Sequence, residues 1–168
     1  VMEAPGGEPG HRNAGWTIKD IEFLPDAYEL KGREQGEATA MMMGRVSYEA
    51  FSTVWPSMTD DFAHYNAMPK FVVSTTLDDS SLVANWGKQQ ILRSLDEVAV
   101  IKDAHEGNIL VHGSATLNRN LADAGLIDRY NLLVFPVLLG SGKRLFSQTD
   151  KDKQKLKVVE AESYSNGI

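Results

Sequence analysis

In Ile109-Leu-Val-His-Gly-Ser-Ala-Thr-Leu117 an apolar run ends in a small-residue turn and opens into a helix, a pattern typical of an α/β fold. The run from Ile109 to Val111 predicts a short strand, and Gly113 allows the chain to turn tightly. The helix after the turn is predicted by apolar residues at helical spacing, which are Leu117, Leu121 and Ala124.

The start of this helix is a candidate anion site. Backbone N–H groups in the first turn of a helix have no partner inside the helix, and the helix dipole favours negative charge there. Here these groups belong to Ser114, Ala115 and Thr116, and they suit the diphosphate of a cofactor. The alternative, for this stretch taken alone, is an ordinary strand–glycine–helix junction that binds nothing.

Length and composition limit the class of protein. The 168 residues fit a single domain, residues 1–168, and a hydrophobic content of 42% is typical of a globular protein. No apolar run approaches the roughly 18 residues of a membrane span. A net charge of −6 argues against a nucleic-acid surface. The absence of cysteine excludes disulfides and thiol chemistry, and it fits a cytoplasmic location.

Two further strands are predicted to end in small polar residues. The apolar run from Thr39 to Met43 predicts a strand buried on both faces, and Ser47 is expected to cap the helix that follows it. The run from Lys70 to Ser74 predicts the next strand. The first strand is followed by Gly44, Arg45, Val46 and Ser47, and the second ends in Ser74, Thr75 and Thr76.

These strand ends are expected to converge. Strands that alternate with helices are parallel, so their carboxyl ends lie along one edge of the sheet, where open α/β sheets bind ligands. Together they supply two helix starts, one guanidinium and several hydroxyls, which make an anion site of nucleotide size. The alternative is that these residues serve only as turn and cap residues.

The pattern changes towards the C-terminus, because no helix is predicted after residue 125. We expect antiparallel strands there, over residues 130–135, 137–139, 145–146 and 156–164. Asn166-Gly167 is a hairpin-turn signal with only one residue after it, and the chain opens like the exit from an earlier strand. We therefore expect the first and last strands of the fold to be missing from the printed sequence.

Five sequence motifs of the chain resemble those of a known family. The motifs are Met43-Gly-Arg-Val-Ser-Tyr-Glu49, Phe71-Val-Val-Ser-Thr-Thr-Leu77, Val111-His-Gly-Ser-Ala-Thr-Leu117, Gly125-Leu-Ile-Asp128 and Pro136-Val-Leu-Leu-Gly-Ser-Gly-Lys-Arg-Leu-Phe146. They resemble the dihydrofolate-reductase-like family typified by the C-terminal reductase domain of bacterial riboflavin biosynthesis. The resemblance covers nearly the whole chain. It implies an α/β three-layer sandwich with a mostly parallel sheet and antiparallel C-terminal strands.

The resemblance also implies NADPH as cofactor. By this similarity Gly44, Arg45 and Ser47 hold phosphate, Ser74 and Thr75 lie near the adenosine 2′-phosphate, and residues 113–117 wrap the diphosphate. The full set of implied cofactor residues is Gly44, Arg45, Val46, Ser47, Ser74, Thr75, Thr76, Gly113, Ser114, Ala115, Thr116 and Leu117. Many members of the family carry a basic residue where this chain has Thr75, so the use of NADH stays open.

The catalytic residues are not readable from the sequence. Asp26 and Glu29 open a predicted helix that runs to Gln35, roughly where folate reductases hold a buried acid, and solvated helix-start carboxylates are the alternative. Trp16 is a candidate floor of the substrate pocket or an ordinary core residue. His112 either touches the nicotinamide side or is a packed or solvent-facing histidine. No metal site is expected, because the four histidines share no ligand spacing.

The sequence thus predicts an NADPH-dependent reductase of the riboflavin-biosynthesis type, acting on 5-amino-6-(5-phosphoribosylamino)uracil or a similar small molecule. A dihydrofolate or general pteridine reductase is the second enzyme hypothesis. A non-catalytic nucleotide-binding member of the family is the hypothesis from another class. The resemblance further implies a homodimer with residues 136–146 at the contact, against the alternative of an intramolecular hairpin.

Overall fold

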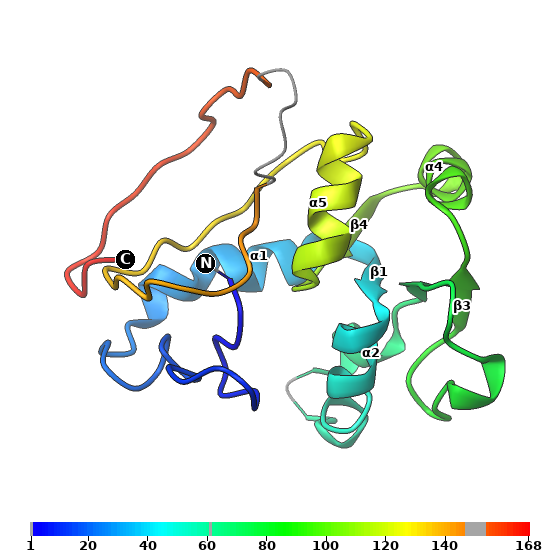
Figure 1. Ribbon diagram of the computed structural model, residues 1–168, viewed down its shortest axis with the longest axis horizontal. Helices are drawn as coiled ribbons and strands as arrows, with labels where there is room; N and C mark the ends of the chain where they lie inside the picture. Colours follow the sequence, from blue (N-terminus) through cyan, green and yellow to red (C-terminus); the bar gives the residue numbers. More distant parts are fainter. Residues whose placement is uncertain (1, 61, 147–153) are drawn as a thin grey trace.

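The computed structural model describes residues 2–60, 62–146 and 154–168. Its sheet has four strands in the order β3-β2-β1-β4, and every neighbouring pair is parallel (Figure 1). The strands are β1 (Ala38–Gly44), β2 (Lys70–Val73), β3 (Gln89–Leu92) and β4 (Asn108–Val111). The register pairs Gly44 with Val73 and Met42 with Val111, so the carboxyl ends of three adjacent strands are aligned.

Strand β1 forms the centre of the core because both of its faces are covered. Met41 and Met43 belong to one buried cluster, while Ala40 and Met42 belong to the other. All four residues are at most 3% exposed. The prediction of a strand buried on both faces is confirmed, and the alternation follows from the two-residue repeat of a strand.

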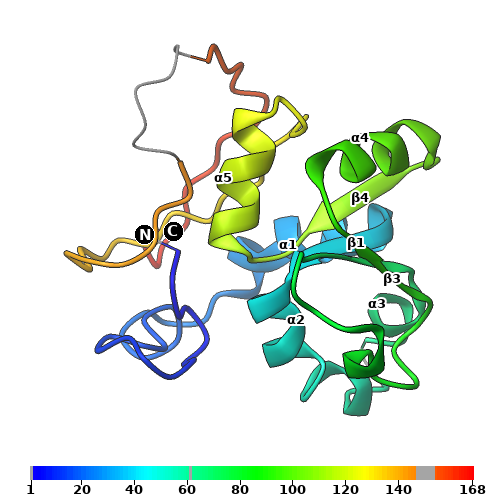
Figure 2. The same cartoon turned by 45° about the vertical axis from the view of Figure 1, so that its right-hand side comes forward.

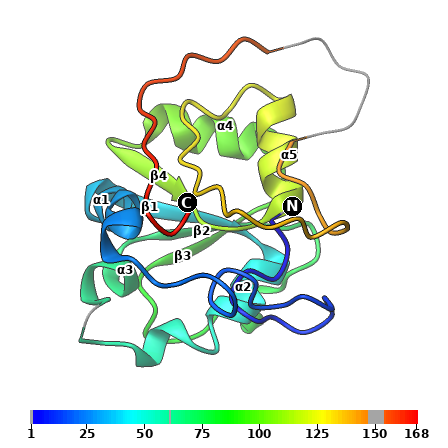
Figure 3. The same ribbon diagram turned by 90° about the vertical axis from the view of Figure 1, so that its left-hand side faces the viewer.

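The helices cover the two faces of the sheet as separate layers. Helices α2 (Arg45–Phe51) and α3 (Ala63–Ala67) pack on one face through Tyr48 and Tyr65. Helices α4 (Leu95–Ala104) and α5 (Ala115–Asp123) pack on the other, and their core residues are Val98, Leu117 and Leu121. Figure 3 shows the sheet between these two layers, so the predicted three-layer sandwich is confirmed.

The predicted N-terminal helix is also present. It consists of a 3-10 turn, η1 (Pro25–Tyr28), and helix α1 (Glu29–Glu37), which contacts β4. Two more 3-10 turns, η2 (Trp55–Ser57) and η3 (Asp79–Ser81), lie in the connections that follow α2 and β2. Residues 2–24 form turns and bends, and in Figure 2 this N-terminal segment lies beside the C-terminal segments.

The expected antiparallel C-terminal strands do not form in the described residues. Residues 130–146 and 154–164 contain no strand, and their backbone bonds form no ladder. Val137 bonds to Phe135 and Ser141 to Leu139, both two residues away, and the long-range bond from Met2 N–H to the Lys143 carbonyl is isolated. The sequence pattern supplies alternating apolar residues, but a ladder also needs a neighbouring strand, and none lies beside these segments in the described chain. The turn predicted at Asn166-Gly167 is present, closed by a bond from Gly167 N–H to the Tyr164 carbonyl.

A buried lysine closes the end of helix α3. Lys70 has no exposed surface, and its Nζ donates to the carbonyls of Tyr65 at 3.0 Å, Asn66 at 2.8 Å and Met68 at 2.8 Å. The ammonium group also lies 4.9 Å from the centre of the Trp86 ring. Burial lowers the pKa of Lys70 to about 8, so the group stays mostly charged at neutral pH. Three helix-end carbonyls thus receive donors that the backbone cannot supply.

Replacing Lys70 by methionine keeps the length of the side chain and removes all three donors. Buried carbonyls without a partner are costly, so we expect the free energy of unfolding to fall by about 2–4 kcal/mol in urea titrations. Lys88→Met is the matched control, because Lys88 is an exposed lysine of the neighbouring connection. Equal effects of the two substitutions would contradict this role of Lys70.

Candidate functional site

The three predicted strand ends form one site at the carboxyl edge of the sheet. Gly44 ends β1, Ser74 follows β2 directly, and Gly113 lies two residues beyond β4. Because β2, β1 and β4 are neighbours, these ends lie side by side. A side-chain carbon placed on Gly44 would lie 3.6 Å from the Ser114 hydroxyl, which shows how closely the junctions approach. We call this set of junctions the strand-end site.

A chain of hydrogen bonds connects two of the junctions. The Gly44 N–H donates to Ser114 Oγ at 2.9 Å, and Ser114 Oγ donates to Ser47 Oγ at 2.7 Å. Gly113 and Ser114 both have positive φ, 76° and 64°, and the Asn118 side chain donates to the Gly113 carbonyl at 2.6 Å. The turn before α5 is therefore held from both sides.

The prediction that Ser47 caps helix α2 is wrong. Helix α2 begins at Arg45, and its N-cap residue is Gly44. The strand passes into the helix without an intervening turn, which places Ser47 in the first helical turn. Its hydroxyl instead accepts the bond from Ser114 and joins the two junctions.

The start of α5 offers unpaired donors, as the sequence predicted. Within the described residues the backbone N–H groups of Ser114, Ala115 and Thr116 donate no hydrogen bond, and the first bond of the helix runs from Asn118 N–H to the Ser114 carbonyl. Leu117 is different, since its side chain is 6% exposed and packs in the core. The N–H groups before it fit an anion by number and chemistry.

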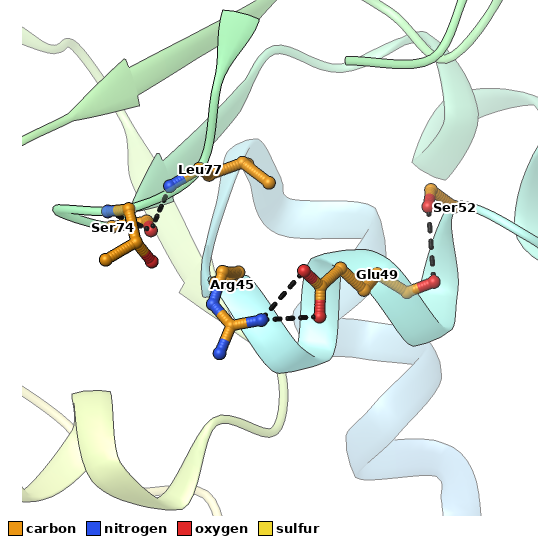
Figure 4. A network of polar contacts seen from close by, with 6 residues as sticks. Arg45, Glu49, Ser52, Ser74 and Leu77 are labelled. Carbon is orange, nitrogen blue, oxygen red and sulfur yellow. Dashed lines mark hydrogen bonds and ion pairs between the residues drawn. The ribbon is translucent and has the colours of Figure 1, made fainter. Parts of the chain in front are cut away.

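Arg45 supplies the guanidinium at the start of α2. Its Nη1 donates to both carboxylate oxygens of Glu49, at 2.8 and 2.9 Å, and its side chain is 44% exposed (Figure 4). The remaining guanidinium nitrogens have no partner among the described residues, so they are available to a phosphate. Val46 beside it is 62% exposed and makes no polar contact with its side chain.

The turn after β2 is closed by its own serine. Ser74 Oγ accepts the N–H groups of Thr76 at 3.2 Å and Leu77 at 3.0 Å, while the side chains of Thr75 and Thr76 are exposed. Figure 4 shows Ser74 and Arg45 at the same edge of the sheet. The turn presents exposed hydroxyls next to the first residue of α2.

Sequence reasoning missed Arg93, which brings a second guanidinium to this turn. Arg93 follows β3, and its Nη1 donates to the carbonyls of Ser74 at 3.0 Å and Leu77 at 2.7 Å. The signal was present in the sequence, because Arg93 comes directly after the apolar pair Ile91-Leu92. It is the polar residue at the end of a fourth parallel strand.

His112 lies beside the glycine turn and is packed between aromatic rings. The ring centres of Phe51 and Tyr65 lie 5.6 and 6.1 Å from that of His112, both in edge-on geometry. Burial lowers the pKa of His112, Lys31 lowers it further, and Glu34 acts in the opposite direction. The imidazole is therefore neutral at neutral pH.

The two candidate acids do not lie at a buried position. Asp26 in η1 and Glu29 at the start of α1 are both exposed, which agrees with the alternative of solvated helix-start carboxylates. The acid of α1 whose side chain is largely shielded from solvent is Glu34, with 8% of that side chain exposed. Glu34 accepts bonds from Lys31 at 2.8 Å and from the Asn131 amide at 3.0 Å. Nothing in the sequence distinguishes it, because most residues of this helix are charged or polar.

Trp16 is placed away from the strand-end site, in the N-terminal loop. Its indole N–H donates to the Glu3 carbonyl at 2.9 Å, and its ring meets Phe135 edge-on at 5.3 Å. It borders a pocket of about 330 Å³ whose other lining residues are Arg12, Asn13, Lys19, Asp20, Val137, Leu138 and Leu139. The pocket shares no residue with the strand-end site, and the role of Trp16 in substrate binding stays a prediction.

The described residues hold no group of three or more histidine, aspartate or glutamate side chains that could bind a metal ion. In the same part of the chain, none of the helices is long and apolar enough to cross a membrane.

Comparison with known proteins identifies the family. The family described as the RibD C-terminal domain matches residues 6–168. The chain belongs to this family. It is 28% identical over 134 residues to the uncharacterized protein YyaP of Bacillus subtilis (strain 168), a match that covers 76% of this chain and 69% of that protein.

The fold of the family is also seen in a solved structure. A crystal structure of a proposed riboflavin biosynthesis protein from Shewanella sp. PV-4 superposes with a TM-score of 0.64 at 18% identity. The match covers 89% of this chain and 81% of that one, and it shows a common fold. The sequence resemblance to the dihydrofolate-reductase-like family is thereby confirmed.

Proposed function

We propose that this protein is an NADPH-dependent reductase of the riboflavin-biosynthesis type, with a ribosylaminopyrimidine such as 5-amino-6-(5-phosphoribosylamino)uracil as substrate. Members of the RibD C-terminal domain family are in general reductase-like. The observation that carries the proposal is the strand-end site, where the free N–H groups of α5 and the guanidinium of Arg45 lie on neighbouring junctions. The cytoplasmic location stays a prediction.

The donor set fits a dinucleotide phosphate in charge and in number. In the proposed complex the N–H groups of residues 114–116 and the free nitrogens of Arg45 hold the diphosphate, and Ser74, Thr75 and Arg93 face the adenosine phosphate. Bound NADPH supplies hydride to a carbon of the substrate. The chain itself contributes a rigid anion site, because the Gly44–Ser114–Ser47 bonds fix the junctions before any ligand arrives.

Arg45→Ala tests the site directly. A charged hydrogen bond to phosphate contributes about 1.5–3 kcal/mol, so we expect the Kd for NADPH to rise about 10- to 100-fold, measured by quenching of tryptophan fluorescence. Arg33→Ala is the matched control, because Arg33 is a similarly exposed arginine paired with a glutamate at 2.8 Å outside the strand-end site. An unchanged Kd in the Arg45 variant would show that the site is assigned to the wrong residues.

Turnover separates the enzyme hypotheses. NADPH oxidation is followed with the ribosylaminopyrimidine, with dihydrofolate and with simple carbonyl compounds. Preference for the ribosylaminopyrimidine supports the proposal, and preference for dihydrofolate supports a pteridine reductase. Preference for a simple carbonyl compound contradicts both substrate assignments. NADPH binding without turnover of any of these supports a non-catalytic nucleotide-binding protein. If neither NADPH nor NADH binds, the proposal is wrong.

Arg93 is proposed to provide the preference for NADPH over NADH, because it brings positive charge to the turn at Thr75. The two dinucleotides differ only in the 2′-phosphate. We expect Arg93→Gln to weaken NADPH binding about 10-fold and to leave NADH binding nearly unchanged, with Arg93→Lys intermediate. Equal weakening for both dinucleotides would mean that Arg93 only stabilises the turn.

The homodimer is a further proposal, with the contact at residues 136–146. Leu138 is fully exposed and Phe146 is 47% exposed, and Val134, two residues before the segment, is 72% exposed, which leaves apolar surface along and beside it. Leu138→Asp is expected to convert a dimer into a monomer in light scattering coupled to size exclusion. Val100→Asp is the control, because Val100 is 66% exposed on α4. A monomeric wild-type protein would exclude this contact.

A further inference from the structure

His112 is held by a single directional contact. Its Nδ1 lies 3.3 Å from the hydroxyl of Tyr65, and this hydroxyl has no other partner among the described residues. Tyr65 is 2% exposed, and burial raises its pKa well above the usual value, so the phenol keeps its proton. A buried O–H without an acceptor is costly, so Tyr65 donates and Nδ1 accepts.

This contact fixes the position of the imidazole proton. A neutral imidazole carries one proton, and if Nδ1 accepts, the proton resides on Nε2. The charged groups that act on the ring are Lys31 and Glu34 on α1, and neither forms a hydrogen bond with it. Helices α2 and α3 contribute Phe51 and Tyr65 to its surroundings. Nothing on these elements accepts the proton of Nε2.

The Nε2–H is therefore a donor without a partner in the described part of the chain. It is not an orphaned buried atom, because the only buried side-chain nitrogen or oxygen without a partner there is Nε of Arg119. The donor thus has access to solvent or to a ligand. His112 is the neighbour of Gly113 in the sequence. A side-chain carbon added at Gly113 would lie 3.6 Å from the Ser47 hydroxyl and 3.7 Å from the Phe51 ring, so this turn lies close to the start of α2.

The order of the strands indicates which part of a ligand His112 would face. With the adenosine phosphate at the turn after β2 and the diphosphate at β1 and β4, a dinucleotide runs across the sheet in the order β2, β1, β4. Its nicotinamide end then lies on the β4 side, where α1 contacts β4. His112 follows β4 directly, and its ring contacts Tyr65 of α3.

We propose that His112 is a hydrogen-bond donor to the reducible substrate, locked in its Nε2–H form by Tyr65. This inference rests on the proposed reductase function. When hydride adds to a carbon, the C=N or C=O π bond breaks, a C–H bond forms, and the electron pair moves to nitrogen or oxygen. The Nε2–H donates a hydrogen bond to that atom, and water then supplies the proton. The hydride donor, a reduced nicotinamide, is oxidised.

The first test determines the tautomer of His112 in the ligand-free protein. Long-range nitrogen-15 NMR of the histidine rings distinguishes the two neutral tautomers and the imidazolium. We expect His112 to be neutral with its proton on Nε2 at neutral pH, and to stay neutral when the pH falls to that of an ordinary histidine midpoint. Tyr65→Phe should give a mixture of tautomers. A proton on Nδ1, or a charged ring at neutral pH, overturns the inference whether or not the protein is a reductase.

The second test measures how the Nε2–H donor of His112 affects turnover. His112→Phe keeps the ring and removes the donor, so kcat should fall about 10- to 100-fold with an unchanged Kd for NADPH. His112→Gln returns an N–H near the position of Nε2 and should restore most of this loss. His105→Gln is the control, because His105 bonds to Thr39 at the opposite end of β1.

The outcomes separate the two proposals. Wild-type protein that binds NADPH, shows the Nε2–H form and reduces none of the substrates contradicts the reductase function. Wild-type protein that turns over substrate, with His112→Phe as active as wild type, contradicts the role of His112 alone. Equal losses in the Phe and Gln variants assign His112 a packing role and also overturn the inference.

Discussion

The side chain of Ser114 holds the two junctions of the strand-end site together. It accepts the N–H of Gly44 and donates to Ser47, so one hydroxyl joins the β4–α5 turn to the β1–α2 junction. Ser114 has a left-handed backbone, which costs a non-glycine residue about 1–3 kcal/mol, and the two bonds offset part of this cost. The free donors of α5 and the guanidinium of Arg45 are consequently held on one rigid frame.

The two arginines at this frame can exchange their present partners for a phosphate. The protein is acidic overall, but its strand ends carry Arg45 and Arg93. Arg45 is paired with Glu49 on the surface, and such exposed pairs contribute only about 0–1 kcal/mol. Arg93 bonds to two neutral carbonyls and keeps its full charge. Both cations can therefore meet a phosphate without first losing a strong partner.

Prediction from sequence succeeded where local pattern determines the structure. The runs at Thr39–Met43 and Ile109–Val111 became neighbouring strands, and parallel pairing then brought their ends together. It failed at Ser47, because the exact residue at which a strand becomes a helix depends on the neighbouring junction. It also failed after residue 130, where strands need partners that no local pattern supplies. Arg93 and Glu34 acquire their positions from sheet register and helix packing, which spacing alone does not reveal.

The methionines at positions 41–43 of β1 make the core sensitive to oxidation. All three are buried, so an oxidant reaches their sulfur atoms only when the sheet opens. A sulfoxide is polar and chiral, and β1 has no solvated face that could accommodate one. Oxidation during a brief opening would thus prevent the sheet from closing again. The sensitivity of the folded protein to oxidants therefore depends on how often its central strand becomes exposed, rather than on the number of its methionines.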